Sequence, residues 1–407
     1  MSEPWDVLVI GGGPGGLAAA AEAARAGARV AVCERNAEIG GPVRTTGGSF
    51  VADLEKLGIP AELYHPVHRC RFVSPSQEAV FEYRQPLGCV IDVRRTYQFL
   101  AGRAAEAGAN LLVGHKALAP LVVDGVVSGA RVYSWRGQQV EFTSKVLIDA
   151  SGHRAEMLRA LGLYGGCKAF GVGAEYDLYA PHCDPDEAVL IVGSQVAPAG
   201  YGWAFPWGRN RVRVGVGILN ADAKADPGAY LTKFVAEAGR FKINLRGAQP
   251  LEYHTGVVPA EGMRETLVAD GLMAVGDAAG QASTLLGEGI RWAIWAGRMA
   301  GAVAAEAARK GDASQPFLMK YQQQWQDTYG MRLRVAYQIN RRIARYDDAK
   351  WDARTAVFKT LSPQQFADVI ASNFTAGFFL RSAISHPEYL KLGLQKIVEK
   401  AGDLLRR

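Results

Sequence analysis

Three aromatic residues alternate with small residues in one short segment, and such a row could bind a flat or apolar ligand. Tyr201, Trp203 and Phe205 are separated by Gly202 and Ala204. Alternation at a period of two predicts a strand that projects the three rings from one face of a sheet. The rings would form either ordinary core or the wall of a pocket, and we favour the pocket.

A glycine cluster near the N-terminus has the spacing of a nucleotide-binding turn. An apolar strand precedes the turn and an alanine-rich helix follows it. In GxGxxG the first glycine permits the turn, the second lets the backbone approach a pyrophosphate, and the third lets the helix pack on the strand. The predicted cofactor-binding residues of this turn are Gly11, Gly13, Pro14, Gly15 and Gly16.

A carboxylate follows the turn at the distance along the chain that a dinucleotide site requires. The second predicted strand begins at Val30 and ends at Glu34, about 20 residues after the first glycine. Such a carboxylate accepts hydrogen bonds from ribose hydroxyls, and it disfavours a 2′-phosphate because two negative groups would be buried together. We therefore predict that Glu34, with Arg35 beside it, binds an adenosine ribose.

A second glycine-rich segment, far along the chain, suits the other end of a long cofactor. A short apolar strand over residues 272–275 leads to Asp277, whose carboxylate could bind the hydroxyls of a ribityl chain. Gly289 and Ile290 begin the next helix, and the positive end of its dipole would favour an anionic reduced flavin. The alternative is that Asp277 only caps a helix. Because the sequence holds no second GxGxxG, one cofactor contacted by both segments is predicted, which fits FAD.

The chain resembles the group of FAD-dependent enzymes that contains aromatic hydroxylases, flavin halogenases and geranylgeranyl reductases. The residues that carry the resemblance stand in the group's order: Gly11, Gly13 and Gly16 with Glu34, Asp149 with Gly152, and Gly276 with Asp277. The likeness covers roughly residues 5–310. It implies an α/β fold with a Rossmann-type FAD-binding domain, an antiparallel-sheet substrate domain and a helical C-terminal region.

The resemblance divides the chain into three regions. The FAD-binding domain is expected from residues 1–165 and 255–310, and the substrate-binding sheet from residues 166–254 with a contribution from 70–95. Residues 311–407 form the helical region, where apolar residues recur every three or four positions. We expect these helices to cover the substrate cavity.

Within the group, the aromatic row is similar to the YxWxFP and GxG signature of geranylgeranyl reductases. The matching residues are Tyr201, Trp203, Phe205, Pro206, Gly215 and Gly217. The resemblance implies that the first four of these contact the substrate. It also implies that the enzyme saturates isolated double bonds of a prenyl chain with hydride from reduced FAD, and that NAD(P)H or another reductant donates the electrons. The catalytic residues stay unknown, since no acid is identified by the sequence.

The segment 38–48 is similar to the loop that lies beside the flavin in those enzymes. Its predicted cofactor contacts are Arg44, Thr45 and Thr46. Two departures stand out, because archaeal relatives carry cysteine where Thr45 stands and glycine where Glu288 stands. Arg94 is a further candidate for a flavin contact, with ordinary surface charge as the alternative.

Two other functions stay open. One is a monooxygenase or halogenase of the same group, although no lysine loop like that of the halogenases is found and hydroxylases lack the YxWxFP signature. The other is a flavoprotein that passes electrons to a quinone.

Composition limits the setting in which the chain works. Apolar residues make up 49% and charged residues 21%, as in globular proteins, and the apolar run over 7–10 is far too short to cross a bilayer. Five cysteines without CxxC spacing predict a reducing cytosol and no metal site. The formal net charge of +6 comes with no nucleic-acid-binding module. We predict a cytoplasmic protein that binds a hydrophobic prenyl chain and contacts the inner face of the membrane peripherally through basic helices such as 331–346.

Overall fold

The two glycine-rich segments contribute strands to one sheet in the computed structural model, which describes residues 3–219, 222–375 and 377–379 of the 407. In spatial order this sheet contains β17 (Val268–Ala269), β18 (Leu272–Ala274), β11 (Gln139–Asp149), β1 (Trp5–Ile10), β2 (Val30–Glu34) and β8 (Asn110–Val113). All neighbours from β18 to β8 pair in parallel. An antiparallel extension of β11 contains β10 (Val126–Ser134) and β9 (His115–Val123).

Helices cover both faces of the parallel strands, which explains why these strands are apolar throughout. Val7, Leu8 and Val9 are fully buried. The helices of this region are α1 (Pro14–Arg25), α3 (Val93–Glu106), α4 (Glu156–Ala160) and α6 (Ile290–Lys310). The predicted Rossmann-type arrangement is confirmed, with the first predicted strand present as β1 and the strand before Asp277 as β18.

Glycines allow α1 and α6 to pack backbone to backbone. A β-carbon added at Gly297 would lie 2.2 Å from the Gly15 carbonyl oxygen, and one added at Gly301 would lie 2.3 Å from the Ala19 carbonyl oxygen. No side chain larger than hydrogen fits at either position. The close contact brings the N-terminal ends of both helices to the same edge of the sheet.

A second sheet, largely antiparallel, forms the other half of the molecule. In spatial order it contains β16 (Gln249–Pro259), β12 (Phe170–Tyr179), β15 (Arg211–Leu219), β14 (Ala197–Gly208), β13 (Glu187–Gly193), β5 (Arg69–Val73) and β6 (Glu78–Glu82). One face packs against α5 (Pro227–Ala236) through Leu231 and Phe234. A small third sheet contains β3 (Gly48–Phe50), β7 (Gly88–Ile91) and β4 (Tyr64–Val67).

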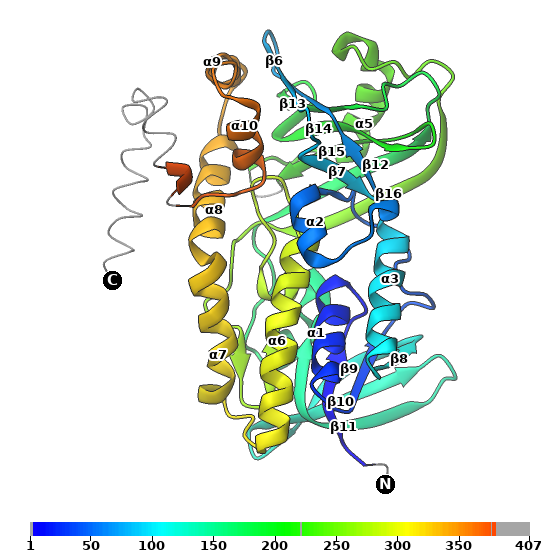
Figure 1. The fold of residues 1–407 in the computed structure, drawn as a ribbon, viewed down its shortest axis with the longest axis vertical. Helices are drawn as coiled ribbons and strands as arrows, with labels where there is room; N and C mark the ends of the chain where they lie inside the picture. Colours follow the sequence, from blue (N-terminus) through cyan, green and yellow to red (C-terminus); the bar gives the residue numbers. More distant parts are fainter. Residues whose placement is uncertain (1–2, 220–221, 376, 380–407) are drawn as a thin grey trace.

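The C-terminal helices run along the molecule and end beside the second sheet (Figure 1). They are α7 (Gln315–Trp325), α8 (Met331–Ile343), α9 (Asp348–Phe358) and α10 (Pro363–Ile370), with a π-helical turn, η5 (Gln326–Gly330), between α7 and α8. The other short elements are α2 (Val51–Leu57), η1 (Ala61–Leu63), η2 (Gly152–Arg154), η3 (Ala238–Phe241) and η4 (Gly276–Ala279). Of the predicted helical region 311–407, residues 376 and 380–407 lie outside the described residues.

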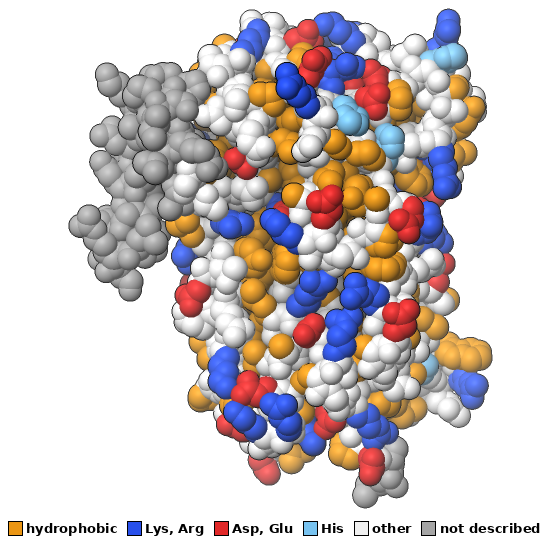
Figure 2. Space-filling model, viewed as in Figure 1, with side chains coloured by type: hydrophobic (Ala, Val, Ile, Leu, Met, Phe, Trp, Pro, Cys, Tyr) orange, Lys and Arg blue, Asp and Glu red, His pale blue; other side chains and the backbone are white. Residues whose placement is uncertain are grey.

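Charged side chains of both signs are mixed over the face shown in Figure 2, with hydrophobic side chains between them. Among the residues that the structure describes, no helix is both long enough and apolar enough to span a bilayer. The described part of the chain also holds no cluster of His, Cys, Asp and Glu with the geometry of a metal site.

Candidate active site and cofactor groove

The glycine turn after β1 combines close packing with open space. A β-carbon at Gly11 would lie 2.2 Å from the Ala150 carbonyl oxygen, and one at Gly16 would lie 2.1 Å from the Gly11 carbonyl oxygen. At Gly13 no atom lies within 4 Å of that position, and no side chain caps the start of α1. The uncapped N–H groups of α1 therefore face open space, which is the arrangement that binds phosphate at a helix N-terminus.

Glu34 closes one side of this turn. Its Oε2 accepts a hydrogen bond of 2.8 Å from the Gly12 amide, its Oε1 accepts one of 2.7 Å from the Asn36 amide, and the residue is 8% exposed. Each carboxylate oxygen has a second lone pair, so the group can still accept hydrogen bonds from a diol. The next residue, Arg35, points to Glu156, with 3.6 Å between Nη1 and Oε1.

Asp277 lies in η4, shortly after β18. Burial raises the pKa of this carboxyl group from 3.8 to about 6, and the charge of Arg264 opposes the rise. No described residue donates a hydrogen bond to the carboxylate, so Asp277 does not cap a helix within the described chain. A β-carbon at Gly289, the N-cap of α6, would lie 3.6 Å from Oδ1 of Asp277. The Asp277 carboxylate thus stands beside the first turn of α6.

These observations fit a dinucleotide that carries a flavin. The N-terminus of α1, which has no side-chain cap, can meet a negatively charged group. At the start of α6 the Glu288 carboxylate already accepts a hydrogen bond of 3.4 Å from the Arg291 amide. Glu34 and Asp277 offer acceptors for ribose and ribityl hydroxyls, respectively. The two distant segments are brought together where Gly15 packs against Ala293 of α6.

We expect Glu34→Ala to weaken FAD binding by about 1.5–3 kcal/mol, the scale of a hydrogen bond to a charged group, or about 10–150-fold in Kd. Titration of the FAD-free protein with FAD, followed by flavin fluorescence, measures the change. Glu141→Ala is the matched control, because Glu141 is an exposed carboxylate of β11 that pairs with Arg131 and lies outside the predicted cofactor residues. An unchanged Kd for Glu34→Ala would place the adenosine elsewhere.

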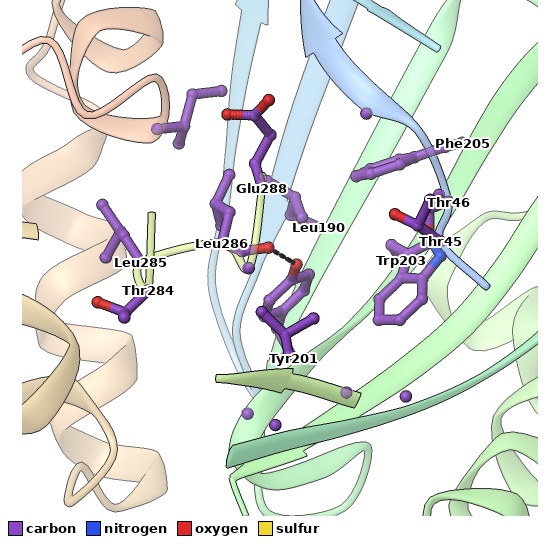
Figure 3. Close-up of a pocket in the computed structure, with 18 of the residues that line it drawn as sticks. Thr45, Thr46, Leu190, Tyr201, Trp203, Phe205, Thr284, Leu285, Leu286 and Glu288 are labelled. Atoms are coloured by element: carbon purple, nitrogen blue, oxygen red, sulfur yellow. Dashed lines mark hydrogen bonds between the residues drawn. The ribbon is translucent and has the colours of Figure 1, made fainter. Parts of the chain in front are cut away.

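A cavity of about 320 Å³ lies between the second sheet and the C-terminal helices (Figure 3). Its floor is formed by residues of β12, β14, β15 and β16. The helical side is lined by Ile339, Ile343, Trp351, Phe358, Phe366 and Ile370. Residues of β5, β7 and β13 also line the cavity. Two further segments of its wall are Arg44–Phe50 and Thr284–Ile290, which include residues predicted to lie beside the flavin. The cavity thus joins an apolar interior to the end of the cofactor groove.

The aromatic row lies on the cavity face of β14. Tyr201, Trp203 and Phe205 all line the cavity, and the first two rings have centroids 5.4 Å apart. The Tyr201 hydroxyl donates a hydrogen bond of 2.6 Å to the Leu286 carbonyl (Figure 3). Phe205 approaches the flavin-side segment, where a β-carbon at Gly48 would lie 3.3 Å from its ring.

Pro206 does not line the cavity, which corrects its expected place in the wall. It pairs with Val212 across β14 and β15, and Val212 belongs to the core on the other face of the sheet. Alternation along a strand turns successive side chains to opposite faces, so a residue next to Phe205 cannot share its face.

Glycines under the Trp203 ring explain the GxG half of the signature, a role that sequence reasoning missed. A β-carbon at Gly215 would lie 2.2 Å from Cζ2 of Trp203, and one at Gly217 would lie 3.3 Å from Cζ3. The indole lies flat across β15 because these positions carry no side chain. Trp203 faces Gly215 in the strand register, and this pairing could have suggested the contact.

The flavin-side loop brings one of its three predicted residues, Thr46, into hydrogen-bonded contact with the second sheet. Arg213 donates hydrogen bonds to the carbonyls of Thr46 and Ile91, the second at 3.0 Å. Arg44 is exposed at the cavity edge, and its carbonyl lies against Gly256. Thr45 lines the cavity between them.

Arg94 and Glu288 take part in ion pairs. Arg94 donates to both oxygens of Glu38 at 2.9 and 3.0 Å on the surface, so its guanidinium already has a partner. Glu288 lines the cavity and pairs with Arg291 at 2.8 Å. Burial raises the pKa of Glu288, and Arg291 opposes the rise. Arg291 also pairs with Asp53 at 2.6 Å, so two carboxylates share one guanidinium, and the charge of Asp53 adds to the rise in the pKa of Glu288.

A buried acid–base chain, which sequence reasoning did not identify, reaches the cavity across the sheet. Oε2 of Glu175 accepts hydrogen bonds from Trp203 Nε1 at 2.8 Å and from Thr46 Oγ1 at 2.5 Å. Its Oε1 lies 3.0 Å from Nδ1 of His254, whose Nε2 lies 3.1 Å from Oε2 of Glu252. Glu175 and His254 are 3% and 6% exposed. They face each other in the register of β12 and β16, which local sequence patterns do not specify.

Comparisons with family models divide the chain where the two sheets meet. A model described as FAD dependent oxidoreductase matches residues 6–163, and one described as geranylgeranyl reductase catalytic domain matches residues 170–258.

Whole-chain relatives are similar along nearly the full length. Digeranylgeranylglycerophospholipid reductase of Methanosphaerula palustris is 33% identical over 380 residues, which cover 90% of this chain and 93% of the relative. Digeranylgeranylglycerophospholipid reductase 2 of Methanothermobacter thermautotrophicus is 33% identical over 356 residues, which cover 86% and 90%.

Solved structures agree with these relatives. A geranylgeranyl bacteriochlorophyll reductase-like protein from Thermoplasma acidophilum has a TM-score of 0.85 and 27% identity, with 97% of this chain and 99% of that chain covered. The flavin-dependent brominase Bmp2 has a TM-score of 0.72 at 18% identity, over 95% of this chain and 100% of its own. The second likeness shows a shared fold alone.

Proposed function

Because the chain belongs to the geranylgeranyl reductase family of FAD-dependent oxidoreductases, we propose that it saturates isolated C=C bonds of a prenyl chain in an isoprenoid lipid or quinone tail. The observation that carries this proposal is the apolar cavity with an aromatic wall, which ends at the flavin-side loop. FAD, when bound, supplies the hydride. NAD(P)H or another reductant is proposed to supply the electrons.

The cavity suits a substrate that offers no charge to bind. A prenyl chain can be held only by burial, at about 25 cal/mol per Å² of apolar surface. Rings on the sheet side and aliphatic side chains on the helical side provide that surface. The protein's part in the reaction is then to position the double bond, to exclude water and to hold a proton ready.

We propose that the cofactor contacts are those arranged along the groove. Gly11, Gly13, Pro14, Gly15 and Gly16 would hold the pyrophosphate, Glu34 the adenosine ribose and Asp277 the ribityl chain. Gly289 and Ile290 would face the flavin ring together with Arg44, Thr45 and Thr46. Residues 1–165 and 255–310 would then form the FAD-binding domain, apart from the end of β16, which continues in the second sheet to Pro259.

Mass spectrometry of reaction mixtures tests the proposed activity. The protein loaded with FAD and a chemical reductant is incubated without oxygen with geranylgeranyl lipids or menaquinones. A product that is heavier by two hydrogens for each reduced bond is expected. Oxygen consumption with substrate-dependent hydroxylation or halogenation would favour the monooxygenase or halogenase alternative, and reduced quinone rings with intact tails would favour an electron carrier.

We further propose that basic residues near the cavity contact an anionic bilayer. Arg341, Arg342, Arg345 and Lys350 border a surface depression on α8 and α9. The same helix lines the cavity through Ile339 and Ile343, so a chain leaving the bilayer here would enter the cavity directly. Attraction to anionic lipids is worth about 1 kcal/mol for each Lys or Arg near the surface.

The double variant Arg341→Glu/Arg342→Glu is therefore expected to bind phosphatidylglycerol vesicles about 30-fold more weakly at least. Flotation with these vesicles, and with neutral phosphatidylcholine vesicles, measures the binding. Arg131→Glu serves as the control, because Arg131 is an exposed arginine in β10, where it pairs with Glu141. If the wild type, the double variant and Arg131→Glu bind phosphatidylglycerol vesicles equally well, this surface does not contact the bilayer.

A further inference from the structure

Saturation of a double bond consumes a proton as well as a hydride, so the proton needs a route into a cavity that excludes water. Resting on the proposed function, we propose that Glu252, His254 and Glu175 form a proton relay from solvent to the cavity, and that Glu175, through the Thr46 hydroxyl, protonates the alkene. Glu288 also lines the cavity and is linked to the partly exposed Asp53 through Arg291. That path cannot relay a proton, because an arginine guanidinium stays protonated in proteins.

The path is continuous and each step is a hydrogen bond. The Glu252 side chain is 43% exposed and exchanges protons with water. His254 bridges the two carboxylates, at 3.1 Å from Glu252 and 3.0 Å from Glu175. Glu175 then meets the Thr46 hydroxyl, and both residues line the cavity.

The register of the second sheet builds this path as one row. His254 of β16 faces Glu175 of β12, Glu175 faces Gly215 of β15, and Gly215 faces Trp203 of β14. Because Gly215 has no side chain, the Trp203 indole crosses β15 and donates to Glu175. The aromatic wall and the acid are therefore positioned by the same contact.

Charges around His254 favour a held proton. Burial lowers the pKa of His254, but its hydrogen bonds to Glu175 and Glu252 raise the pKa by more than burial lowers it. The net pKa therefore lies above the ordinary value. Arg213 opposes the rise, although Arg213 itself pairs with Asp177 at 3.3 Å. Arg211 pairs with Glu252 at 3.4 Å and keeps the outer carboxylate ionised at neutral pH.

The proton and electron balance closes. His254 gives its Nδ1 proton to Oε1 of Glu175 and takes a proton at Nε2 that entered at Glu252. The neutral Glu175 carboxyl then turns about its Cγ–Cδ bond, so that its protonated oxygen faces the Thr46 hydroxyl. The carboxyl donates its proton to that hydroxyl, which gives its own proton to one alkene carbon. The π electrons form that C–H bond, the hydride from reduced flavin forms the bond to the other carbon, and Glu175 returns to the carboxylate.

Tyr201 carries the hydroxyl group of the aromatic row, but the proton of that hydroxyl already forms a hydrogen bond. The hydroxyl donates to the Leu286 carbonyl at 2.6 Å, and burial raises its pKa. A group that holds its proton more tightly than usual and has no path to solvent is a poor acid for this step.

Glu175→Gln separates proton transfer from structure. The amide oxygen still accepts from Trp203 and the amide nitrogen can donate to His254, but the side chain carries no transferable proton. Glu187→Gln is the matched control, because Glu187 lies in the same sheet, pairs with Arg71 at 2.7 Å and does not line the cavity. His254→Gln interrupts the relay one step earlier and replaces Glu175→Gln if that variant does not retain FAD.

Stopped-flow reoxidation of reduced flavin by a geranylgeranyl lipid, across a pH series, is the first readout. We expect Glu175→Gln and His254→Gln to slow it by at least about 100-fold, the scale of general acid catalysis, with FAD affinity unchanged. Glu187→Gln should keep the wild-type rate and pH profile. If the flavin of Glu175→Gln is reoxidised at the wild-type rate, the relay is overturned while the proposed function stays intact.

Nitrogen-15 NMR titration of the His254 ring is the second readout and needs no substrate. We expect a pKa above about 6.5 in the wild type and a lower one in Glu175→Gln. If no prenyl lipid reoxidises the wild type, the proposed function fails and this titration decides the relay alone. An ordinary His254 pKa that Glu175→Gln does not change would then overturn it.

Discussion

Gly215→Ala is expected to disable the cavity while FAD stays bound. The new methyl group would lie 2.2 Å from Cζ2 and 2.3 Å from Cε2 of Trp203, which is closer than non-bonded atoms can approach. The ring must therefore leave β15, lose its hydrogen bond to Glu175 and enter the cavity. Overpacking of this kind costs about 1–3 kcal/mol of folding free energy. We expect prenyl reduction to fall by at least about 10-fold, one factor of ten for each 1.4 kcal/mol lost in substrate positioning.

A series of glycine substitutions under the same ring provides the control. The added β-carbon would lie 3.3 Å from the indole at Gly217 and 3.8 Å from it at Gly173, against 2.2 Å at Gly215. The loss of stability in thermal and urea unfolding should follow the order Gly215→Ala, Gly217→Ala, Gly173→Ala. Equal losses at the three positions would mean that backbone entropy, and not the Trp203 contact, sets the cost.

Asp277→Asn is expected to weaken FAD binding and at the same time to stabilise the FAD-free protein. The carboxylate lacks a partner among the described residues, and burial raises its pKa to about 6. The pKa of this carboxyl group is higher in the folded protein than its unfolded value of 3.8. The protein therefore loses stability as the pH rises from about 4 to about 6. Asparagine carries no charge and removes that loss. Loss of a charged acceptor for ribityl hydroxyls should raise the Kd for FAD by about 10–150-fold.

The sign of the stability change depends on pH. Above about pH 6 the FAD-free variant should be more stable than the wild type by about 1–3 kcal/mol. The lower end of this range allows for solvent screening, since the Asp277 side chain is only partly buried. Below about pH 4 the two proteins should unfold alike. Urea unfolding at pH 4 and pH 8 measures both limits. A variant that is less stable at pH 8, or that binds FAD as the wild type does, would show that Asp277 serves the fold alone.

Several local features of the sequence specified the cofactor half of the molecule. Turn sterics act within a few residues, so the GxGxxG cluster predicted a strand, a turn and a helix, which are β1 and α1. Strand periodicity is equally local and predicted that Tyr201, Trp203 and Phe205 share a face. The same periodicity excludes Pro206 from that face, yet the family signature had placed it there.

The sequence by itself determined the fold class and the family, because each depends on short-range geometry or on a contiguous signature. Only the tertiary structure decided the row of His254, Glu175, Gly215 and Trp203, whose members lie on four strands. Register between strands far apart in the chain is set by the packing of whole sheet faces, and no local spacing encodes it. The buried proton path and the room under the indole therefore become visible only when the strands are paired.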